Sequence, residues 1–322
     1  EKELPDEERS YIQVESSLQA LKDLALLYRN NLDVKVVGIT GSVGKTSTKE
    51  TISSVLSEKY RVLKTLGNFN NEIGLPLTVF RLTEDDEVAV LEMGISDFGE
   101  MERLSKIAQP DICVITNIGF CHLENLGTRD GILKAKTEIF NHMNPDGIVI
   151  VNGDDDKLST ISQVHGKRPL VFGISNKDGV YADNIKSLGL DGTSFTIHGI
   201  KTSDNYSTFD LTVPVPGHHM VYNAMAAALV GSVLGLSSIE IERGVKNLKT
   251  IAGRNNIIKE NGFTIIDDCY NANPVSMKAS LDVLDTAIGR KVAILGSMFE
   301  LGENEKQMHY DVGMYLGTKD ID

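Results

Sequence analysis

The chain has 322 residues, of which 41% are hydrophobic and 24% charged, and its formal net charge is −13. These values are typical of a globular protein with roughly two domains, and they argue against a broad basic surface for nucleic acid, although a local basic site for an anionic substrate stays open. Three cysteines without paired spacing favour a reducing compartment over a disulfide framework or a zinc site. The acidic start is unlike a signal peptide, and no apolar run reaches the ~18 residues of a membrane span, so we expect a cytoplasmic protein without nucleic-acid or membrane partners.

The first half of the chain alternates short apolar runs with helical patterns. A polar segment, residues 1–15, is predicted to be a linker and precedes a helix near 16–30. The predicted elements then follow in turn: strand 34–39, helix 45–58, strand 88–92, helix 101–108, strand 111–119, helix 128–143 and strand 147–156. Because apolar strands alternate with helices, we predict a mostly parallel sheet covered on both faces, an α/β fold.

The pattern changes near residue 179. Residues 180–199 and 206–217 have period-two stretches and Gly and Asp turns, which predict a small antiparallel patch at the edge of the domain. Two helices are predicted at 218–235 and 237–248. A strand at 265–267, a helix from about 274 and a strand at 291–297 then predict a second, Rossmann-like domain of only about 70 residues, which is small for such a unit.

The segment GITGSVGKTSTKE, residues 38–50, joins the first predicted strand to its helix. Glycines let backbone N–H groups approach phosphate oxygens, a lysine neutralises charge, and the helix N-terminus adds its dipole. The spacing departs from the strict G-x-x-x-x-G-K-[ST] pattern, because Ile39 stands where the first glycine belongs. An ordinary strand-to-helix turn is the competing interpretation. The predicted nucleotide-binding residues are Gly41, Ser42, Val43, Gly44, Lys45, Thr46 and Ser47.

Two other short motifs do not support a different nucleotide enzyme. The segment SNKDG differs from the N-K-x-D motif of GTPases, because its aspartate comes one residue too soon. The segment SDFGEM contains the D-F-G of kinases, but the chain lacks an H-R-D loop. We attribute both matches to chance.

Two residues that follow buried strands are candidates for a metal site. A magnesium ion bound by the Thr46 hydroxyl needs further oxygen ligands. Glu92 closes the apolar strand VAVLE, and His122 follows the next strand on the same carboxyl edge of the sheet. A strand-end carboxylate that faces water, and a structural histidine, are the competing interpretations.

Seven ordered motifs between about residues 14 and 310 resemble the Mur ligases, and within them the branch that adds D-alanyl-D-alanine. The motifs NFNNEIG and YNANP separate that branch from the sister ligases and from folylpolyglutamate synthase. The full set is TGSVGKTSTKE, TLGNFNNEIGLPLTVF, LEMGISDFGEM, TNIGFCHLENLGTRDGILKAKTEIF, VPGHHMVYNAMAA, AGRNN and DDCYNANPVSMKAS.

The resemblance implies a domain organisation. The family has a UDP-sugar domain, a central P-loop ATPase domain and a C-terminal Rossmann-like domain. We expect the first to be missing here and the third to be shortened. Residues 1–32 would then be a linker and helix, 33–252 the central ATP-binding domain, and 253–322 a partial C-terminal domain.

The resemblance also implies a reaction. Such ligases use ATP to convert the carboxylate of UDP-N-acetylmuramoyl-tripeptide into an acyl phosphate, which the amine of D-alanyl-D-alanine then attacks. Thr46 and Glu92 would hold a first Mg²⁺, and His122 would help to hold a second. Lys136 matches the family lysine that carries a carbamate made with CO₂, which would make it a metal ligand, whereas the residues alone indicate a solvated helix lysine. The implied catalytic residues are Lys45, Lys136, His122 and Arg254.

Further residues match the nucleotide site of the family. Asn223 and, more weakly, His219 lie on the alanine-rich helix, and Arg254 would reach the ATP phosphates from the domain junction. Asn271 and Asn273 would lie near the nucleotide, with Asp267 and Asp268 ending a strand nearby, although an Asn-Pro turn explains them as well. We expect the loop with Asn68, Asn70 and Asn71 to line the cleft beneath the tripeptide.

Two alternatives to this ligase remain open from the sequence. One is a nucleotide-binding module that kept the loop but not the chemistry, and the other is a sister ligase with another amine or a folate substrate. Retention of Glu92, His122 and Lys136 favours an enzyme. We expect a monomer, and the sequence leaves open whether the tripeptide ends in lysine or diaminopimelate.

Overall fold

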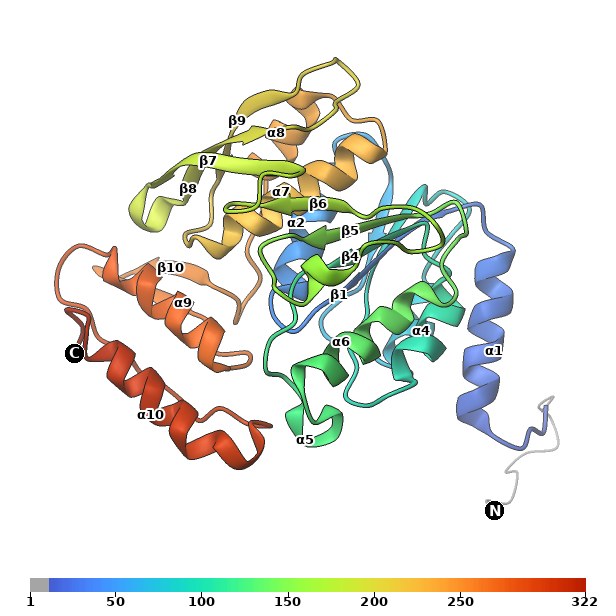
Figure 1. Cartoon of the computed structure of the whole chain (residues 1–322), viewed down its shortest axis with the longest axis horizontal. Coiled ribbons are helices and arrows are strands. Elements are labelled where there is room, and N and C mark those ends of the chain that lie inside the picture. Colours follow the sequence, from blue (N-terminus) through green and yellow to red (C-terminus); the bar gives the residue numbers. More distant parts are fainter. Residues whose placement is uncertain (1–11) are drawn as a thin grey trace.

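The structure, a computed structural model, describes residues 12–322. Residues 1–11, most of the predicted linker, lie outside the described part. A nine-stranded sheet forms the body of the protein (Figure 1), with the strands in the order β2-β3-β1-β4-β5-β6-β7-β8-β9. The strands of the sheet are β1 (Lys35–Thr40), β2 (Val62–Lys64), β3 (Val88–Glu92), β4 (Ile112–Ile115), β5 (Ile148–Asn152), β6 (Leu170–Gly173), β7 (Val180–Ser187), β8 (Thr193–His198) and β9 (Thr208–Val213).

The predicted mostly parallel sheet with an antiparallel edge is confirmed. All neighbours from β2 to β7 pair in parallel, and β7, β8 and β9 pair antiparallel. The strand β6 was not predicted, because only four residues form it between polar turns. The change from parallel to antiparallel pairing follows the change in sequence pattern near residue 179.

Helices cover both faces of the sheet, as the buried strands require. Successive residues of β3 alternate between the two cores: Val88 and Val90 face α2, α7 and α8, whereas Ala89 and Leu91 face α1, α3, α4 and α6. The helices are α1 (Ser17–Asn30), α2 (Lys45–Leu56), α3 (Gly74–Val79), α4 (Glu100–Ala108), α5 (Leu123–Leu126), α6 (Arg129–Thr137), α7 (His219–Val233), α8 (Ser238–Lys246), α9 (Pro274–Asp285) and α10 (Glu305–Leu316). Among residues 12–322, no helix combines the length and apolarity needed to cross a membrane.

The C-terminal elements form a separate layer beside the sheet (Figure 1). The strands β10 (Asn256–Glu260) and β11 (Phe263–Asp267) make an antiparallel pair, and α9 packs against α10. The strand predicted at 291–297 is wrong: no strand forms in this segment, and its Ile294 is 95% exposed. A strand needs a hydrogen-bonding neighbour along its length, and within the described residues this segment has backbone hydrogen bonds to another part of the chain only where Lys291 and Ala293 meet Asp322.

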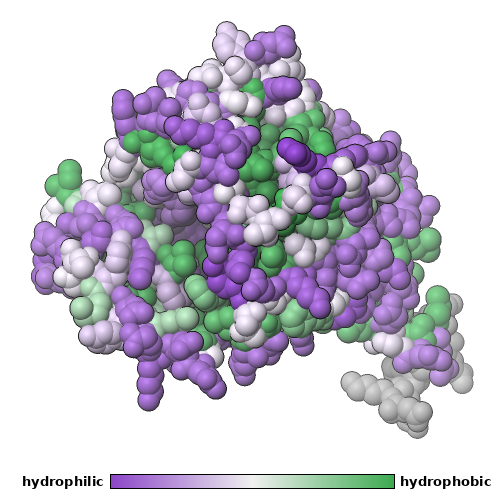
Figure 2. All heavy atoms as spheres, in the orientation of Figure 1, coloured by the Kyte–Doolittle hydropathy of each residue, from purple (hydrophilic) through white to green (hydrophobic). Residues whose placement is uncertain are grey.

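The register of the sheet positions the candidate site. Glu92 pairs with Ile39, and Thr40 pairs with Ile115, so the carboxyl ends of β3, β1 and β4 meet at one edge. The space-filling view shows a recess between this edge and the C-terminal layer (Figure 2). Crevices at the carboxyl ends of parallel strands are the usual ligand sites of such sheets.

Candidate functional site

The loop between β1 and α2 has the backbone geometry of a phosphate cradle. Gly44, the N-cap of α2, has φ 84°, and Gly41 has φ 150°. A Cβ at Gly41 would lie 1.9 Å from the Thr116 hydroxyl oxygen, so only glycine fits there. The Lys45 ammonium donates to the carbonyl oxygens of Gly41 (2.9 Å) and Ser42 (3.4 Å), which keeps this cation at the mouth of the loop.

A second loop, which directly follows β4, holds the phosphate loop in place. The Asn117 side chain accepts a hydrogen bond from the Val43 N–H (2.9 Å) and donates one to the Val43 carbonyl (2.8 Å). The Thr116 hydroxyl donates to the same carbonyl, and the Gly119 N–H donates to the Ser42 hydroxyl. Sequence reasoning missed Asn117; its position directly after a buried strand was the available signal.

Thr46 and Glu92 lie together at the N-terminus of α2, as predicted. The Thr46 hydroxyl donates to Glu92 Oε1 (3.2 Å), and the Asn70 amide donates to the same oxygen (2.9 Å). Glu92 is only 2% exposed, and its Oε2 has no hydrogen-bond partner. Of the predicted cleft loop, Asn70 therefore reaches the site, whereas Asn71 accepts backbone N–H bonds that begin α3.

Lys136 is fully buried on α6, and its Nζ has no hydrogen-bond partner. Burial, followed by repulsion from Lys45, lowers the pKa of Lys136 to about 8. This burial contradicts the solvated helix lysine that the residues alone suggested, because α6 turns this side chain toward the carboxyl edge of the sheet rather than toward water.

His122 lies beside the same cations. Burial lowers the pKa of His122, nearby Lys136 and Lys45 lower it further, and the Glu300 carboxylate opposes this shift. His122 Nδ1 is 2.7 Å from Glu300 Oε2, which belongs to the C-terminal layer. Both residues have positive φ, 54° and 61°, so unusual backbone conformations present the two side chains to each other. The sequence did not indicate Glu300.

Asn223 on α7 contacts the first turns of α2. Its Oδ1 accepts a hydrogen bond from the Thr48 hydroxyl (3.0 Å), and its Nδ2 lies 3.2 Å from the Met220 sulfur. A Cβ at Gly44 would lie 3.5 Å from the same Oδ1. The predicted nucleotide residue is thus beside the phosphate loop, and it also fixes α7 against α2.

The junction near residue 253 is pinned by two carboxylates. Asp267 accepts the Gly253 N–H (2.8 Å), and Asp268 accepts the Asn255 N–H (3.0 Å). Arg254 lies between these two residues in the sequence. Its guanidinium is 4.1 Å from the centre of the Tyr270 ring, a cation–π contact.

Three further predicted residues lie around this junction. His219, at the start of α7, has a pKa lowered by burial, which the Asp268 charge opposes. Asn273 caps α9 through the N–H groups of Val275 and Ser276, and Asn271 accepts the Ala272 N–H. These contacts fit the structural interpretation of the Asn-Pro turn, and the nucleotide role of both asparagines stays a prediction.

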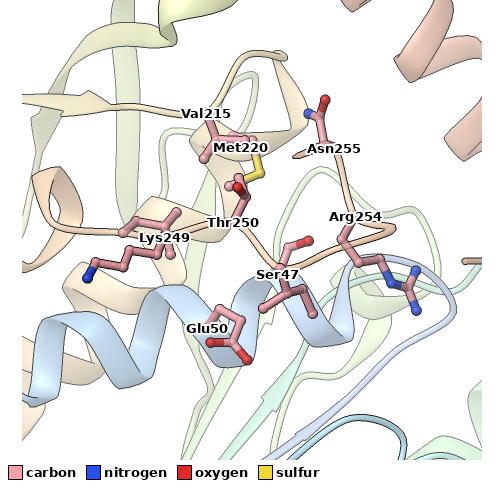
Figure 3. A pocket seen from close by; sticks show the side chains of 10 residues that line it. Ser47, Glu50, Val215, Met220, Lys249, Thr250, Arg254 and Asn255 are labelled. Atoms are coloured by element: carbon pink, nitrogen blue, oxygen red, sulfur yellow. The ribbon is translucent and has the colours of Figure 1, made fainter. Parts of the chain in front are cut away.

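A small, open pocket lies between α2 and the junction (Figure 3). Ser47 and Glu50 reach it from α2, and Arg254 and Asn255 reach it from the junction. Its remaining lining is largely apolar: Val215, Met220, Leu248, Lys249, Thr250 and Ile251.

The residues of this edge fit a magnesium site. Mg²⁺ is usually bound by one or two carboxylates together with substrate phosphates and waters. Next to the phosphate cradle, Thr46 offers its hydroxyl and Glu92 offers Oε2, the carboxylate oxygen that has no hydrogen-bond partner. Within residues 12–322, no three His, Cys, Asp or Glu side chains converge, so a closed all-protein metal cage is absent from this part of the chain.

Two family models match the chain. The model described as Mur ligase middle domain matches residues 39–231, and the model described as Mur ligase, glutamate ligase domain matches residues 253–322. A UDP-N-acetylmuramoyl-tripeptide–D-alanyl-D-alanine ligase of Bacillus subtilis is 42% identical over 99% of this chain and 68% of its own length.

Solved structures agree with these matches. MurF from Acinetobacter baumannii superposes with a TM-score of 0.89 at 36% identity, over 96% of this chain and 67% of that protein. MurF ligase from Thermotoga maritima in complex with ADP superposes with a TM-score of 0.87 at 33% identity, over 99% of this chain and 73% of that protein. The chain therefore spans about two thirds to three quarters of the length of these relatives.

Proposed function

Because this chain belongs to the Mur ligase family, we propose that it joins D-alanyl-D-alanine to UDP-N-acetylmuramoyl-tripeptide during synthesis of the peptidoglycan precursor. It is an ATP-dependent ligase that forms a carbon–nitrogen bond. The observation that carries this function is the position of Thr46 and Glu92, whose oxygens lie 3.2 Å apart at the N-terminus of α2, beside a loop whose Gly41 leaves no room for a side chain.

The residues of the loop supply what the first step requires. A carboxylate is a poor electrophile, and the tripeptide carboxylate becomes reactive once it has attacked the γ-phosphorus of ATP and released ADP. Two anions must approach each other for this attack, so positive charge is needed between them. Lys45, whose ammonium hydrogen-bonds to loop carbonyls within the described residues, and the N–H groups of residues 44–46 supply it. The N–H groups of Ser42 and Val43 already donate to Asn117. In the second step the dipeptide amine attacks the acyl carbon and phosphate leaves.

We assign two magnesium sites to the same edge. Thr46 and Glu92 would hold one ion, and His122 with Lys136 would hold the second. Bound magnesium would withdraw negative charge from the phosphate oxygens, and the chain's part is to orient these ligands. Asn70 does so for Glu92 by its hydrogen bond to Oε1.

Lys136 would serve as a metal ligand after carbamylation. The ammonium first loses one proton, and the neutral amine then attacks CO₂, forms a nitrogen–carbon bond and releases a second proton. The net change converts a cation into an anionic oxygen ligand. The pKa of about 8 leaves part of the Lys136 population neutral near physiological pH, and its Nζ has no hydrogen bond to lose. ¹³C NMR of the protein in ¹³C-bicarbonate tests this role: a carbamate resonance is expected, and it should be absent from Lys136→Met.

The pocket of Figure 3 would receive the nucleoside. Its member Ser47 directly follows the phosphate-binding residues on α2, and its lining is largely apolar, as a base requires. Asn223 lies beside the loop for a further contact. Arg254, now on the Tyr270 ring, would turn to the phosphates when residues 253–322 close over residues 33–252.

The two substrates are UDP-N-acetylmuramoyl-tripeptide and D-alanyl-D-alanine, and we propose a monomer that works in the cytoplasm, where ATP and UDP-linked substrates are available. Phosphate release tests the function in a protein that carries this chain at the full length of its relatives. D-Alanyl-D-alanine should support phosphate release from ATP and UDP-N-acetylmuramoyl-tripeptide, whereas L-lysine, diaminopimelate and glutamate should not. Equal release with any of these amines would refute the assignment.

A further inference from the structure

A buried lysine that the reaction does not use lies directly behind the proposed metal site. Lys49 on α2 is 1% exposed and is among the largest fully buried side chains of the described residues. Thr46, Lys49 and Glu50 are three and four residues apart, so they share one face of α2 and point toward β2 and β3. A lysine is rarely buried so completely unless it is paired with an acid.

Lys49 is paired with two glutamates, one of which is the proposed metal ligand. Its Nζ lies 3.1 Å from Glu50 Oε1 and 3.7 Å from Glu92 Oε2. The other Glu92 oxygen is already occupied by Thr46 and Asn70. The second Glu50 oxygen pairs with Lys64 on β2. The Lys49 ammonium is therefore the only group that faces Glu92 Oε2 in the hydrogen bonds and ion pairs of residues 12–322.

The charges of this cluster cancel without any metal. Lys49 and Lys64 carry two positive charges, and Glu50 and Glu92 carry two negative ones. Lys45 adds a further positive charge at the phosphate loop. A divalent cation that arrives alone would therefore meet a neutral to positive surrounding at low dielectric, where repulsion between like charges is strong. A nucleotide brings the negative charge that reverses this balance.

We propose that Lys49 is a positioning residue that holds the Glu92 carboxylate in place and excludes divalent cations from it until a nucleotide phosphate is bound. This inference rests on the proposed metal role of Glu92. With Lys49 in place, the metal ion should bind with or after the nucleotide and not before it. A lysine that only filled the core would not affect metal binding in the absence of nucleotide. The metal affinity of the nucleotide-free chain therefore separates a core-filling role of Lys49 from the proposed one.

Titration with Mn²⁺, followed by the EPR signal of the free ion, tests the proposal on the whole chain with and without ADP. Without ADP, we expect Lys49→Met to bind Mn²⁺ at least tenfold more tightly than the unchanged chain. Lys49→Arg keeps the charge and should behave like the unchanged chain. Lys35→Met is the matched control, because Lys35 is 60% exposed and pairs with Asp111 away from the site. Adding Glu92→Gln to Lys49→Met should abolish the gained affinity.

The outcomes separate this proposal from the proposed function. If Lys49→Met binds Mn²⁺ no more tightly than the unchanged chain without ADP, while ADP-dependent binding still requires Glu92, the gating role is refuted and the metal site stands. If ADP-dependent Mn²⁺ binding is the same in Glu92→Gln, the metal site itself is refuted, and the gating role with it.

Glu50→Gln covers the case that Lys49→Met does not fold. This variant removes one negative charge from the same cluster while it leaves Lys49 in place. We expect it to weaken Mn²⁺ binding in the presence of ADP at least threefold. An unchanged affinity would refute the charge-balance argument.

Discussion

Replacing Asn117 with alanine tests whether the loop after β4 holds the phosphate loop in its binding conformation. The side chain makes two hydrogen bonds to Val43, of 2.9 and 2.8 Å, and both are lost in Asn117→Ala. Each is worth about 1 kcal/mol net, so the ordered loop loses about 2 kcal/mol relative to other conformations. Only the ordered loop binds ADP, so the apparent ADP affinity falls by the same factor as the population of the ordered loop. A loss of about 2 kcal/mol corresponds to a factor of roughly 30.

Isothermal titration with ADP measures this effect, and urea denaturation measures the free energy of unfolding in parallel. We expect ADP affinity to fall by roughly 10- to 30-fold, since part of the loss can appear in overall stability instead. Asn247→Ala is the control, because the Asn247 side chain donates one hydrogen bond to Glu58, which lies beyond the C-terminal end of α2 and away from the phosphate loop. An Asn117→Ala protein with the ADP affinity of the unchanged chain would refute the bracing role.

Three further predictions concern charged groups of the site. Lys45→Ala should reduce ATP turnover by at least a hundredfold with an unchanged circular dichroism spectrum; normal turnover would overturn the assignment of the loop. Lys136→Met should raise the free energy of unfolding at pH 7 by about 3 kcal/mol in CO₂-free buffer, because burial lowers the pKa from 10.5 to about 8. Between pH 8 and 10.5 the unfolded chain binds more protons than the folded one, so the stability gained by Lys136→Met should shrink as the pH rises. A gain that stays constant with pH in urea denaturation would contradict this prediction. Glu300→Ala removes the partner of His122 and should increase the radius of gyration measured by small-angle scattering without nucleotide; an unchanged radius counts against a closing contact.

The central sheet was predictable because its signals are local. The sequence predicts strand β3 at Val88–Glu92, where it lies, and it predicts the phosphate loop between a strand and a helix, which are β1 and α2. Burial on both faces makes such strands continuously apolar, so they stand out from their surroundings. The resemblance to the Mur ligases supplied the residues that lie far apart in the chain, such as Lys136 and Asn223.

The contacts between distant loops were not predictable. Asn117, Lys49 and Glu300 gain their roles from neighbours 40 to 180 residues away along the chain, and no spacing in the sequence indicates those neighbours. The strand expected at 291–297 failed for the same reason, because its apolar pattern was correct but a strand forms only beside another. The local sequence pattern thus indicates which segments are candidate strands, and pairing with a neighbouring strand decides which of them form.

The most direct test of this account is a crystal structure of the chain with a non-hydrolysable ATP analogue and Mn²⁺. We predict the triphosphate on the N–H groups of residues 44–46, with an anomalous Mn²⁺ peak between Thr46 and Glu92. A triphosphate bound elsewhere, or a metal peak that contacts neither residue, would contradict it.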